Sequence, residues 1–330
     1  MLERCAAALL LAGLCMPAAA QEQTVTVQLV RSIAQAPYYI AVDKGYFARE
    51  GITLQSGLVR SALDTIAPMA SGQLDVGIGA ATAGFFNAAH QGFDLRVVAA
   101  MGIQGAVMAT QPLVRKALWD TGTIRSAKDF PGHKIAINAP GDITEYFLTL
   151  MARKYHLDYK ALNVVPLGFA QQFVAFKNGA IDAGFLPEPL STTARMAGVA
   201  ALDTADDGVG TGTITTFVFF GTKFMQQKPK AALGFLRALV RGARDVQGPY
   251  LKDSAVAASI AKQTDLKVAA IENATPYAID PNLDIAKFEG QLRDQETVHR
   301  EHGELNYAGQ LSFKNVIDAS LVHQAAASLK

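Results

Sequence analysis

The chain has 330 residues, half of which are apolar, and its formal net charge at pH 7 is +1. Such a chain can bury a sizeable core and is long enough for two domains, which argues against a disordered protein. The charges are nearly balanced and there is no basic run, so the sequence does not favour nucleic acid as a partner. No segment after the first 20 residues is apolar enough to span a bilayer.

The N-terminal sequence MLERCAAALLLAGLCMPAAA has the pattern of an export signal. An apolar run over residues 5–16 is followed by a proline and three alanines, the small-residue pattern that signal peptidase cleaves. We expect residues 1–20 to be a signal peptide and the exported, mature protein to begin at Gln21. Lipid attachment at Cys15 is a weaker alternative, because Leu14 stands where a lipobox has a small residue.

The sequence offers no cofactor motif. Cys5 and Cys15 are the only cysteines and both lie in the expected signal peptide, so the mature chain has no disulfide and no thiolate ligand. The glycine-rich stretch at residues 208–213 is not a dinucleotide fingerprint, because its spacing is wrong and no helix follows it. We interpret it as a surface loop or hinge and expect no bound cofactor.

From residue 24 onward, short β-branched runs alternate with helix-like runs, which is typical of an α/β fold with mostly parallel strands. The expected strands are 24–30, 52–59, 75–80, 95–100, 134–138, 164–167, 183–186, a short one near 199–204 and a long one over 214–224. The expected helices are 37–50, 61–72, 81–92, 143–155, 171–178, 229–246 and 284–303.

One unit of this pattern occurs twice. SGQLDVG at residues 71–77 is repeated as NGAIDAG at residues 178–184, and each copy follows an expected strand and helix. Gly72 and Gly179 fit the left-handed position that ends a helix, and the aspartate three residues later opens the next strand. We expect these two aspartates to bond backbone amides, and the repeat predicts two similar α/β lobes.

Two segments carry a resemblance to a known family. APYYIAVDKGYFAREGI (36–52) and DFPGHKIAIN (129–138), together with the repeated unit, resemble the periplasmic solute-binding proteins of ABC importers in the nitrate, sulfonate and taurine group. The resemblance implies the type II periplasmic binding protein fold, in which two α/β lobes close on a solute in the cleft between them. It implies a first lobe of residues 21–108 and 216–330 and a second lobe of residues 109–215. It also implies a monomer that delivers a small organic solute to an inner-membrane permease.

The candidate ligand-binding residues follow from strand positions. In open α/β sheets, ligands bind at the carboxyl ends of the strands and at the amino ends of the following helices, where unpaired N–H groups attract anions. Tyr38, Phe85, Phe169 and Phe217 are candidates for an aromatic wall, although aromatic residues at helical spacing are more often part of the core. The candidate residues are Arg31, Ser32, Gln35, Tyr38, Arg60, Ser61, Ala81, Thr82, Asp142, Thr144, Phe169, Gln171 and Glu188.

Three charged candidates have alternative roles. Arg60 is either a bidentate partner for a carboxylate or sulfonate or a solvated surface group. Asp142 has Glu145 three residues later, the spacing of a capping box, so it is expected to bond amides of its own helix. Glu188 either caps the following helix or receives an ammonium or ring N–H of the solute. These residues favour an organic anion with further polar or aromatic groups, a sulfonate or carboxylate, over nitrate.

Residues 299–304 contain two histidines and two glutamates that could be mistaken for a metal site. His299 and His302 are three residues apart and no third ligand stands at a suitable spacing, so we expect a solvated helix face and no metal.

Two other functions stay open at this stage. One is an enzyme on the same fold that acts on a thiamine- or menaquinone-type precursor, and the other is a periplasmic ligand sensor. The export signal and the absence of cysteine from the mature chain weigh against the enzyme.

Overall fold

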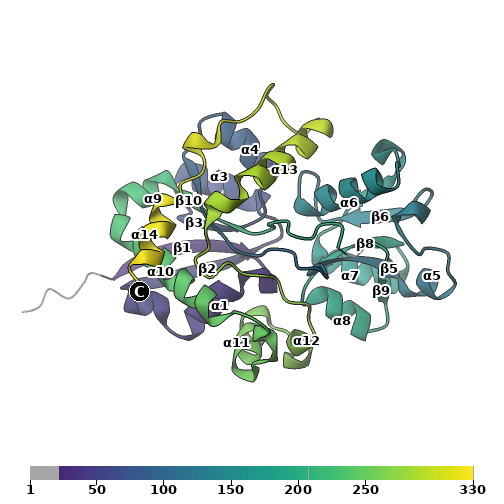
Figure 1. The fold of residues 1–330 in the computed structure, drawn as a ribbon, viewed down its shortest axis with the longest axis horizontal. Coiled ribbons are helices and arrows are strands. Elements are labelled where there is room, and N and C mark those ends of the chain that lie inside the picture. Colours follow the sequence, from purple (N-terminus) through teal and green to yellow (C-terminus); the bar gives the residue numbers. More distant parts are fainter. Residues whose placement is uncertain (1–21, 207, 330) are drawn as a thin grey trace, which may run out of the picture.

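The computed structural model describes residues 22–206 and 208–329, and Figure 1 shows them as two α/β parts placed side by side. The expected signal peptide and both cysteines lie outside the described residues. None of the helices in these two ranges is long and apolar enough to cross a membrane.

The two parts are built on two five-stranded sheets. The first has the order β2 (Ile52–Val59), β1 (Gln23–Val30), β3 (Val76–Gly79), β10 (Phe217–Gly221) and β4 (Leu95–Ala100). The second has the order β7 (Asn163–Pro166), β6 (Lys134–Ile137), β8 (Ala183–Pro187), β5 (Thr110–Arg115) and β9 (Ala200–Leu202). In both sheets the first three strands are parallel and the fourth is antiparallel to both of its neighbours.

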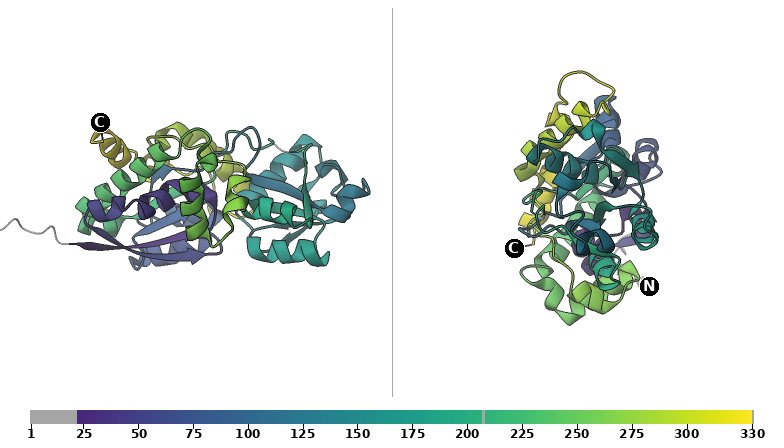
Figure 2. Two further views of the ribbon diagram at one scale, coloured as in Figure 1. Left: turned by 90° about the horizontal axis from the view of Figure 1, so that it is seen from below. Right: turned by 90° about the vertical axis from the view of Figure 1, so that its right-hand side faces the viewer.

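Helices cover both sheets. The helices with the second sheet are α5 (Lys116–Asp120), α6 (Ile143–Lys154), α7 (Phe169–Asn178) and α8 (Leu190–Met196). The others are α1 (Ala36–Asp43), α2 (Tyr46–Arg49), α3 (Leu63–Ser71), α4 (Ala83–His90), α9 (Thr222–Gln227), α10 (Pro229–Asp245), α11 (Ser254–Thr264), α12 (Val268–Glu272), α13 (Glu289–Glu301) and α14 (Ser320–Ala327). The left view of Figure 2 shows the two parts side by side along the long axis of the molecule.

The sequence repeat corresponds to one structural unit in each sheet. β2, α3 and β3 in the first sheet match β7, α7 and β8 in the second, and each helix ends at a left-handed glycine, Gly72 (φ 79°) or Gly179 (φ 70°). As expected, both aspartates accept hydrogen bonds from backbone amides: Asp75 from Thr26 and Asp182 from Lys134, at 3.0 Å in each case. The two carboxylates therefore tie neighbouring strands together far from the strands' carboxyl ends.

The structure corrects four expectations about the elements. The helix expected over 37–50 is broken at Gly45, which has a φ of 67°. The strand expected over 214–224 has only the five residues of β10, because α9 begins at Thr222. β5 was not foreseen. The antiparallel fourth strand of each sheet departs from the mostly parallel pattern, because the chain enters β5 and β10 directly from the other part and not through a crossover helix.

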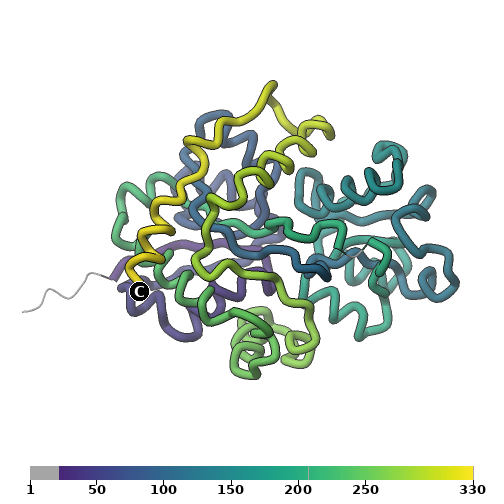
Figure 3. The backbone as a smooth tube through the Cα atoms, viewed as in Figure 1, coloured from purple at the N-terminus to yellow at the C-terminus, as the bar shows by residue number. Residues whose placement is uncertain are grey.

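The chain passes from one sheet to the other in residues 101–109 and returns in residues 203–216 (Figure 3). The two crossing segments pair with each other. The amide of Met101 donates to Thr216, that of Thr215 donates to Gly102, and that of Gln104 donates to Thr213, with N···O distances of 2.8–2.9 Å. A short two-stranded ribbon therefore joins the two parts.

Candidate ligand cleft between the two sheets

The carboxyl ends of strands from both sheets meet around one small cavity of about 40 Å³. Val30, Ala62 and Gly79 line it from the first sheet, and Asn138 and Pro187 line it from the second. Strand position alone predicts this convergence. The remaining lining residues are Ser32, Ala34, Gln35, Ala80, Thr110, Asp142, Ile143, Phe169, Thr215, Thr216 and Tyr277.

The inner cavity presents hydrogen-bond acceptors without partners. Asn138 is only 6% exposed, and its side-chain amide donates through Nδ2 to Asp142 at 3.1 Å. This bond fixes the orientation of the amide, so the unpartnered buried atom is the acceptor Oδ1. The Oε1 atom of the buried Gln35 also lines the cavity without a partner among the described residues. Buried acceptors are costly when unpaired, which indicates that a bound group with N–H or O–H donors completes them.

Asp142 joins the two sides of the cleft. It lies at the N-cap position of α6, and its Oδ2 atom accepts from Ser61 Oγ, which follows β2, and from Asn138 Nδ2, both at 3.1 Å. The expected capping box is altered, since Glu145 accepts from the amide of Gly141 and not from that of Asp142. Burial raises the pKa of the Asp142 carboxyl above its usual range, and the bonds from Asn138 and Ser61 offset only part of this effect.

The three hydroxyls at helix amino ends do not form the open anion site that was expected. Thr82 accepts from the amide of Phe85 in its own helix, and Thr144 accepts from the amide of Asn138. Ser61 donates to Asp142, so a carboxylate of the protein occupies the place where a bare anion would bind. Sequence reasoning missed that these hydroxyls stabilise the protein itself.

The mouth of the cleft is lined by positively charged side chains, whereas the inner cavity contains the Asp142 carboxyl group. A cavity of about 490 Å³ shares Val30 and Phe169 with the inner cavity and is also lined by Arg31, Arg60 and Gln171. A neighbouring cavity of about 260 Å³ contains Arg60, Ser61, Gln171 and Asn138. Both arginines are exposed, and within the described ranges no salt bridge joins either of them to a carboxylate. They are therefore available to an anionic group of a ligand.

Glu188 belongs to the frame of the cleft. Its side chain is 0% exposed and accepts from the amide and hydroxyl of Thr192 and from the amide of Thr275. Its backbone carbonyl accepts from the amide of Ile33 and from the hydroxyl of Ser32, which follow β1. Burial raises the pKa of the Glu188 carboxyl, and these donors offset part of the rise. Of the two roles expected for Glu188, the structure favours capping over contact with a solute.

Tyr38 and Ala81 do not line the cleft. The Tyr38 ring is 2% exposed and packs against Phe47 and Phe235, with centroid distances of 5.5 and 6.4 Å, and its hydroxyl meets Ser56 at 2.5 Å. Tyr38 is therefore a core residue and not part of an aromatic wall, as its helical spacing with other aromatic residues favoured. Phe85 and Phe217 are 0% exposed and also belong to the core.

Sequence reasoning also missed residues that reach the cleft from outside the two repeated units. Thr215 and Thr216 come from a crossing segment, and Tyr277, which bonds Thr110 at 2.9 Å, comes from the stretch after α12. No local pattern identifies them, because only the packing of distant segments brings them to the cavity.

A second polar cluster lies near Gly141, outside the set of residues that line the cavities described above. The expectation of a solvated helix face at residues 299–304 is wrong for His299, which is 1% exposed. Its Nδ1 atom lies 2.9 Å from Glu304 Oε2, and Glu145 of α6 stands beside them. Burial, followed by the neighbouring Glu304 carboxyl, raises the pKa of Glu145 to about 7. Glu301 remains on the exposed face, paired with Arg153.

Two α/β parts, joined by two crossing segments and facing a shared cavity with the carboxyl ends of their strands, define the type II periplasmic binding protein fold. Residues 32–248 match the model of the NMT1/THI5-like family. The match covers more than half of the chain, and the chain belongs to this family. A search of curated proteins gave no sequence match.

Solved structures share the fold at low sequence identity. The alkanesulfonate-binding protein SsuA from Xanthomonas axonopodis pv. citri, bound to MOPS, is 18% identical with a TM-score of 0.68, and the match covers 93% of this chain and 99% of that one. The periplasmic aliphatic sulphonate-binding protein SsuA from Escherichia coli is 16% identical with a TM-score of 0.68, over 86% and 94% of the two chains. The periplasmic nitrate-binding protein NrtA from Synechocystis PCC 6803 is 14% identical with a TM-score of 0.75, over 93% and 89%. The family and fold expected from the sequence are confirmed.

Proposed function

We propose that the protein is the substrate-binding component of an ABC importer, which captures a small organic solute in the cleft and delivers it to a permease in the inner membrane. The observation that carries this proposal is the convergence of strand ends from both sheets on two adjoining cavities. The inner cavity contains unpaired acceptors, and the outer one is lined by Arg31 and Arg60, which have no salt bridge among the described residues. Binding and closure, without covalent chemistry, are the activity of such a protein.

We further propose that residues 21–108 and 216–330 form one lobe and residues 109–215 the other, with the paired crossing segments as the hinge. Opening about this ribbon requires only that contacts across the cleft break, such as the bond from the amide of Ala83 to the carbonyl of Gly141 at 2.9 Å. We also propose that the chain is exported, is cleaved after residue 20 and acts as a monomer in the periplasm.

The cleft favours an organic anion that also carries a hydrogen-bond donor. A sulfonate or carboxylate group would lie at the mouth, where Arg31 and Arg60 can bind it, and an aromatic or aliphatic body would pack on Phe169. An amine or ring N–H at the other end would donate to Asn138 Oδ1 and Asp142. Nitrate fits poorly, because it has no donor and the inner cavity already holds a carboxylate.

A thermal-shift screen of the purified protein, followed by calorimetry, tests this proposal. Matched pairs of ligands that differ only in an amine are the sharpest probes: taurine against ethanesulfonate, and 4-aminobenzenesulfonate against benzenesulfonate. Carboxylates, amino acids, thiamine-type pyrimidines and nitrate complete the screen. A ligand at a hundredfold over its Kd adds about 2.7 kcal/mol of stability, which the screen detects. We expect a shift with one class of organic anion and a larger shift with the amine-bearing member of a pair.

Three outcomes would count against the proposal. Binding of nitrate without binding of any larger acid would overturn the proposed solute. A flat screen would overturn a receptor for these solutes and would favour the enzyme on the same fold or a protein that signals through a partner. Recovery of a chemically altered ligand from the incubated protein would favour the enzyme on the same fold.

A further inference from the structure

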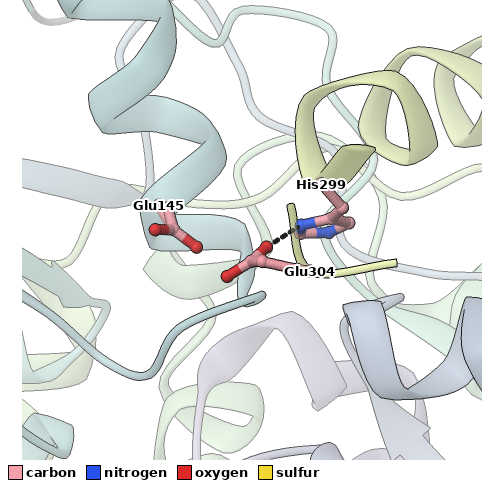
Figure 4. A group of neighbouring side chains, drawn as sticks. All are labelled: Glu145, His299 and Glu304. Atoms are coloured by element: carbon pink, nitrogen blue, oxygen red, sulfur yellow. Dashed lines mark hydrogen bonds and ion pairs between the residues drawn. The ribbon is translucent and has the colours of Figure 1, made fainter. Parts of the chain in front are cut away.

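The cluster of Glu145, His299 and Glu304, here called the Glu-His-Glu cluster, brings three potential metal ligands together from distant parts of the chain. Glu145 lies in the first turn of α6. His299 lies in the last turn of α13, and Glu304 follows that helix. One ligand atom from each residue lies within 4.8 Å of the other two. Figure 4 shows the carboxyl groups of Glu145 and Glu304 facing each other, with the His299 ring on the far side of Glu304.

The surroundings hold these side chains in place. His299 is 1% and Glu145 is 6% exposed. The two carboxylate oxygens of Glu145 accept from the hydroxyl of Tyr159 and from the amide of Gly141, both at 2.7 Å. Such outer contacts orient carboxylate ligands in metal sites. Since α13 packs against both α6 and α4, the backbone that carries the ligands is also fixed.

The two carboxyl groups of the cluster have no lysine or arginine partner among the described residues. They stand side by side in a largely buried place. The nearest basic groups are the His299 imidazole itself and His302, whose Nε2 atom is occupied by the hydroxyl of Thr149 at 2.7 Å. Adjacent carboxylates repel each other unless a proton or a cation lies between them.

We propose that the Glu-His-Glu cluster is a binding site for a divalent transition-metal ion of the zinc class. One imidazole nitrogen and two carboxylate oxygens form a ligand set that Zn²⁺ takes, with water as the fourth ligand. Two ligands at about 2.1 Å from a tetrahedral zinc ion lie roughly 3.4 Å apart. His299 Nδ1 and Glu304 Oε2 are 2.9 Å apart, and the three ligand atoms all lie within 4.8 Å of one another. Their separations are therefore near those that a zinc ion requires.

The site would connect the two proposed lobes. Glu145 belongs to the part built on the second sheet, whereas α13 and Glu304 follow β10 and pack beside α4 of the first. A metal ion held by both sides stabilises the conformation in which they touch, so it favours the closed form. This consequence rests on the proposed closing of the lobes, whereas the metal site itself does not.

Titration of the chelator-treated protein with zinc chloride by calorimetry tests the site. We expect one ion per chain with a Kd in the micromolar range or below, and anomalous scattering at the zinc edge from crystals places it among the three side chains. Glu145→Gln and Glu304→Gln each weaken binding at least tenfold. Glu145→Gln has the shape of a protonated carboxyl and is expected to keep the fold, so this variant decides the question if Glu304→Gln is unstable.

Two variants serve as matched controls for surface binding. Glu301→Gln removes an exposed carboxylate on the same helix, and His323→Gln removes an exposed histidine beside Asp284. Both are expected to change the Kd less than twofold. The proposal is overturned if the wild-type protein binds no zinc with one-to-one stoichiometry, or if the two cluster variants bind it as tightly as the controls. The link to closure is overturned if zinc leaves the radius of gyration of the ligand-free protein unchanged in solution scattering.

Discussion

At the inner end of the cleft, Asn138 and Gln35 present buried acceptors beside the Asp142 carboxylate, whereas at the mouth Arg31 and Arg60 stand exposed and without salt bridges. Asn138 and Asp142 are fixed by hydrogen bonds that include Ser61 of the opposite side, whereas the arginines are free to reorient in solvent. Interactions in the buried end are therefore expected to contribute more affinity per contact, because water screens charges at the mouth. From this difference we propose that the two ends bind different parts of one solute.

The largest effect is expected at the inner end. Asp142→Asn removes the negative charge but keeps the size of the side chain. We expect the affinity for taurine, whose amine is an ammonium group, to fall about 100-fold, because removing one partner of a buried charged pair costs about 2–5 kcal/mol. Calorimetry measures the change. Asp120→Asn, which alters a surface ion pair with Lys116, is the control and is expected to leave the affinity unchanged. Equal affinities in both variants would remove Asp142 from the site.

Closing of the cleft is tested at Gly141, whose φ of 67° costs any other residue about 1–2 kcal/mol. A Cβ atom at this position would lie 2.7 Å from the Cβ atom of Ala83 across the cleft. Gly141→Ala is expected to weaken ligand binding more than tenfold and to leave a larger radius of gyration with ligand present. Gly132→Ala is the matched control, since Gly132 has a φ of 85° and open space around its Cβ position. If both variants bind alike, contact at Gly141 does not accompany binding.

The pH dependence of ligand affinity also distinguishes the inner end of the cleft from its mouth. Burial raises the pKa of Asp142, so its carboxyl stays neutral to a higher pH than an ordinary aspartate. Only the ionised form attracts an ammonium group. The affinity for taurine is therefore expected to rise with pH through this raised pKa, by up to about tenfold per unit, and then to level off. Ethanesulfonate should lack the rise, and Asp142→Asn should abolish it for taurine.

A smaller effect is expected at the mouth. Arg60→Ala removes one charged donor to the anionic group, and hydrogen bonds to charged groups contribute about 1.5–3 kcal/mol before screening. We expect affinity for either sulfonate of a pair to fall about tenfold, with the preference for the amine-bearing member retained. Lys177→Ala removes an exposed charge from the far end of α7 and is the control. Loss of that preference in Arg60→Ala would contradict the division of the cleft into two ends.

No effect on binding is expected from Tyr38→Phe. The hydroxyl bonds Ser56 in the first sheet, so its loss is expected to lower the free energy of unfolding by about 0.5–1.5 kcal/mol. The Kd for the ligand is expected to change less than twofold. Denaturant unfolding and calorimetry measure the two quantities. A tenfold loss of affinity would place the ring in the cleft after all.

The sequence by itself determined the elements and the general position of the site. The alternating runs located nine of the ten strands. Eight of them were placed within a few residues, β10 was predicted as part of a longer run, and β5 was missed. The repeated Gly-x-x-Asp unit predicted two similar sheets because its glycines end helices at fixed offsets. The carboxyl-end rule then placed Ser32, Arg60, Asp142 and Phe169 around the cleft. These inferences succeed because they depend on backbone periodicity and local turns, which a few neighbouring residues encode.

Only the tertiary structure decided which side chains face a ligand and which support the protein. Asp142 binds Ser61 of the opposite side and Asn138 Nδ2, and this pairing leaves the Oδ1 atom of Asn138 without a partner among the described residues. His299 looked like part of a solvated helix until packing placed Glu145, more than 100 residues earlier, beside it. The physical reason is the same in both cases. Hydrogen-bond partners and burial are set by contacts between segments far apart in the chain, and no local pattern carries that information.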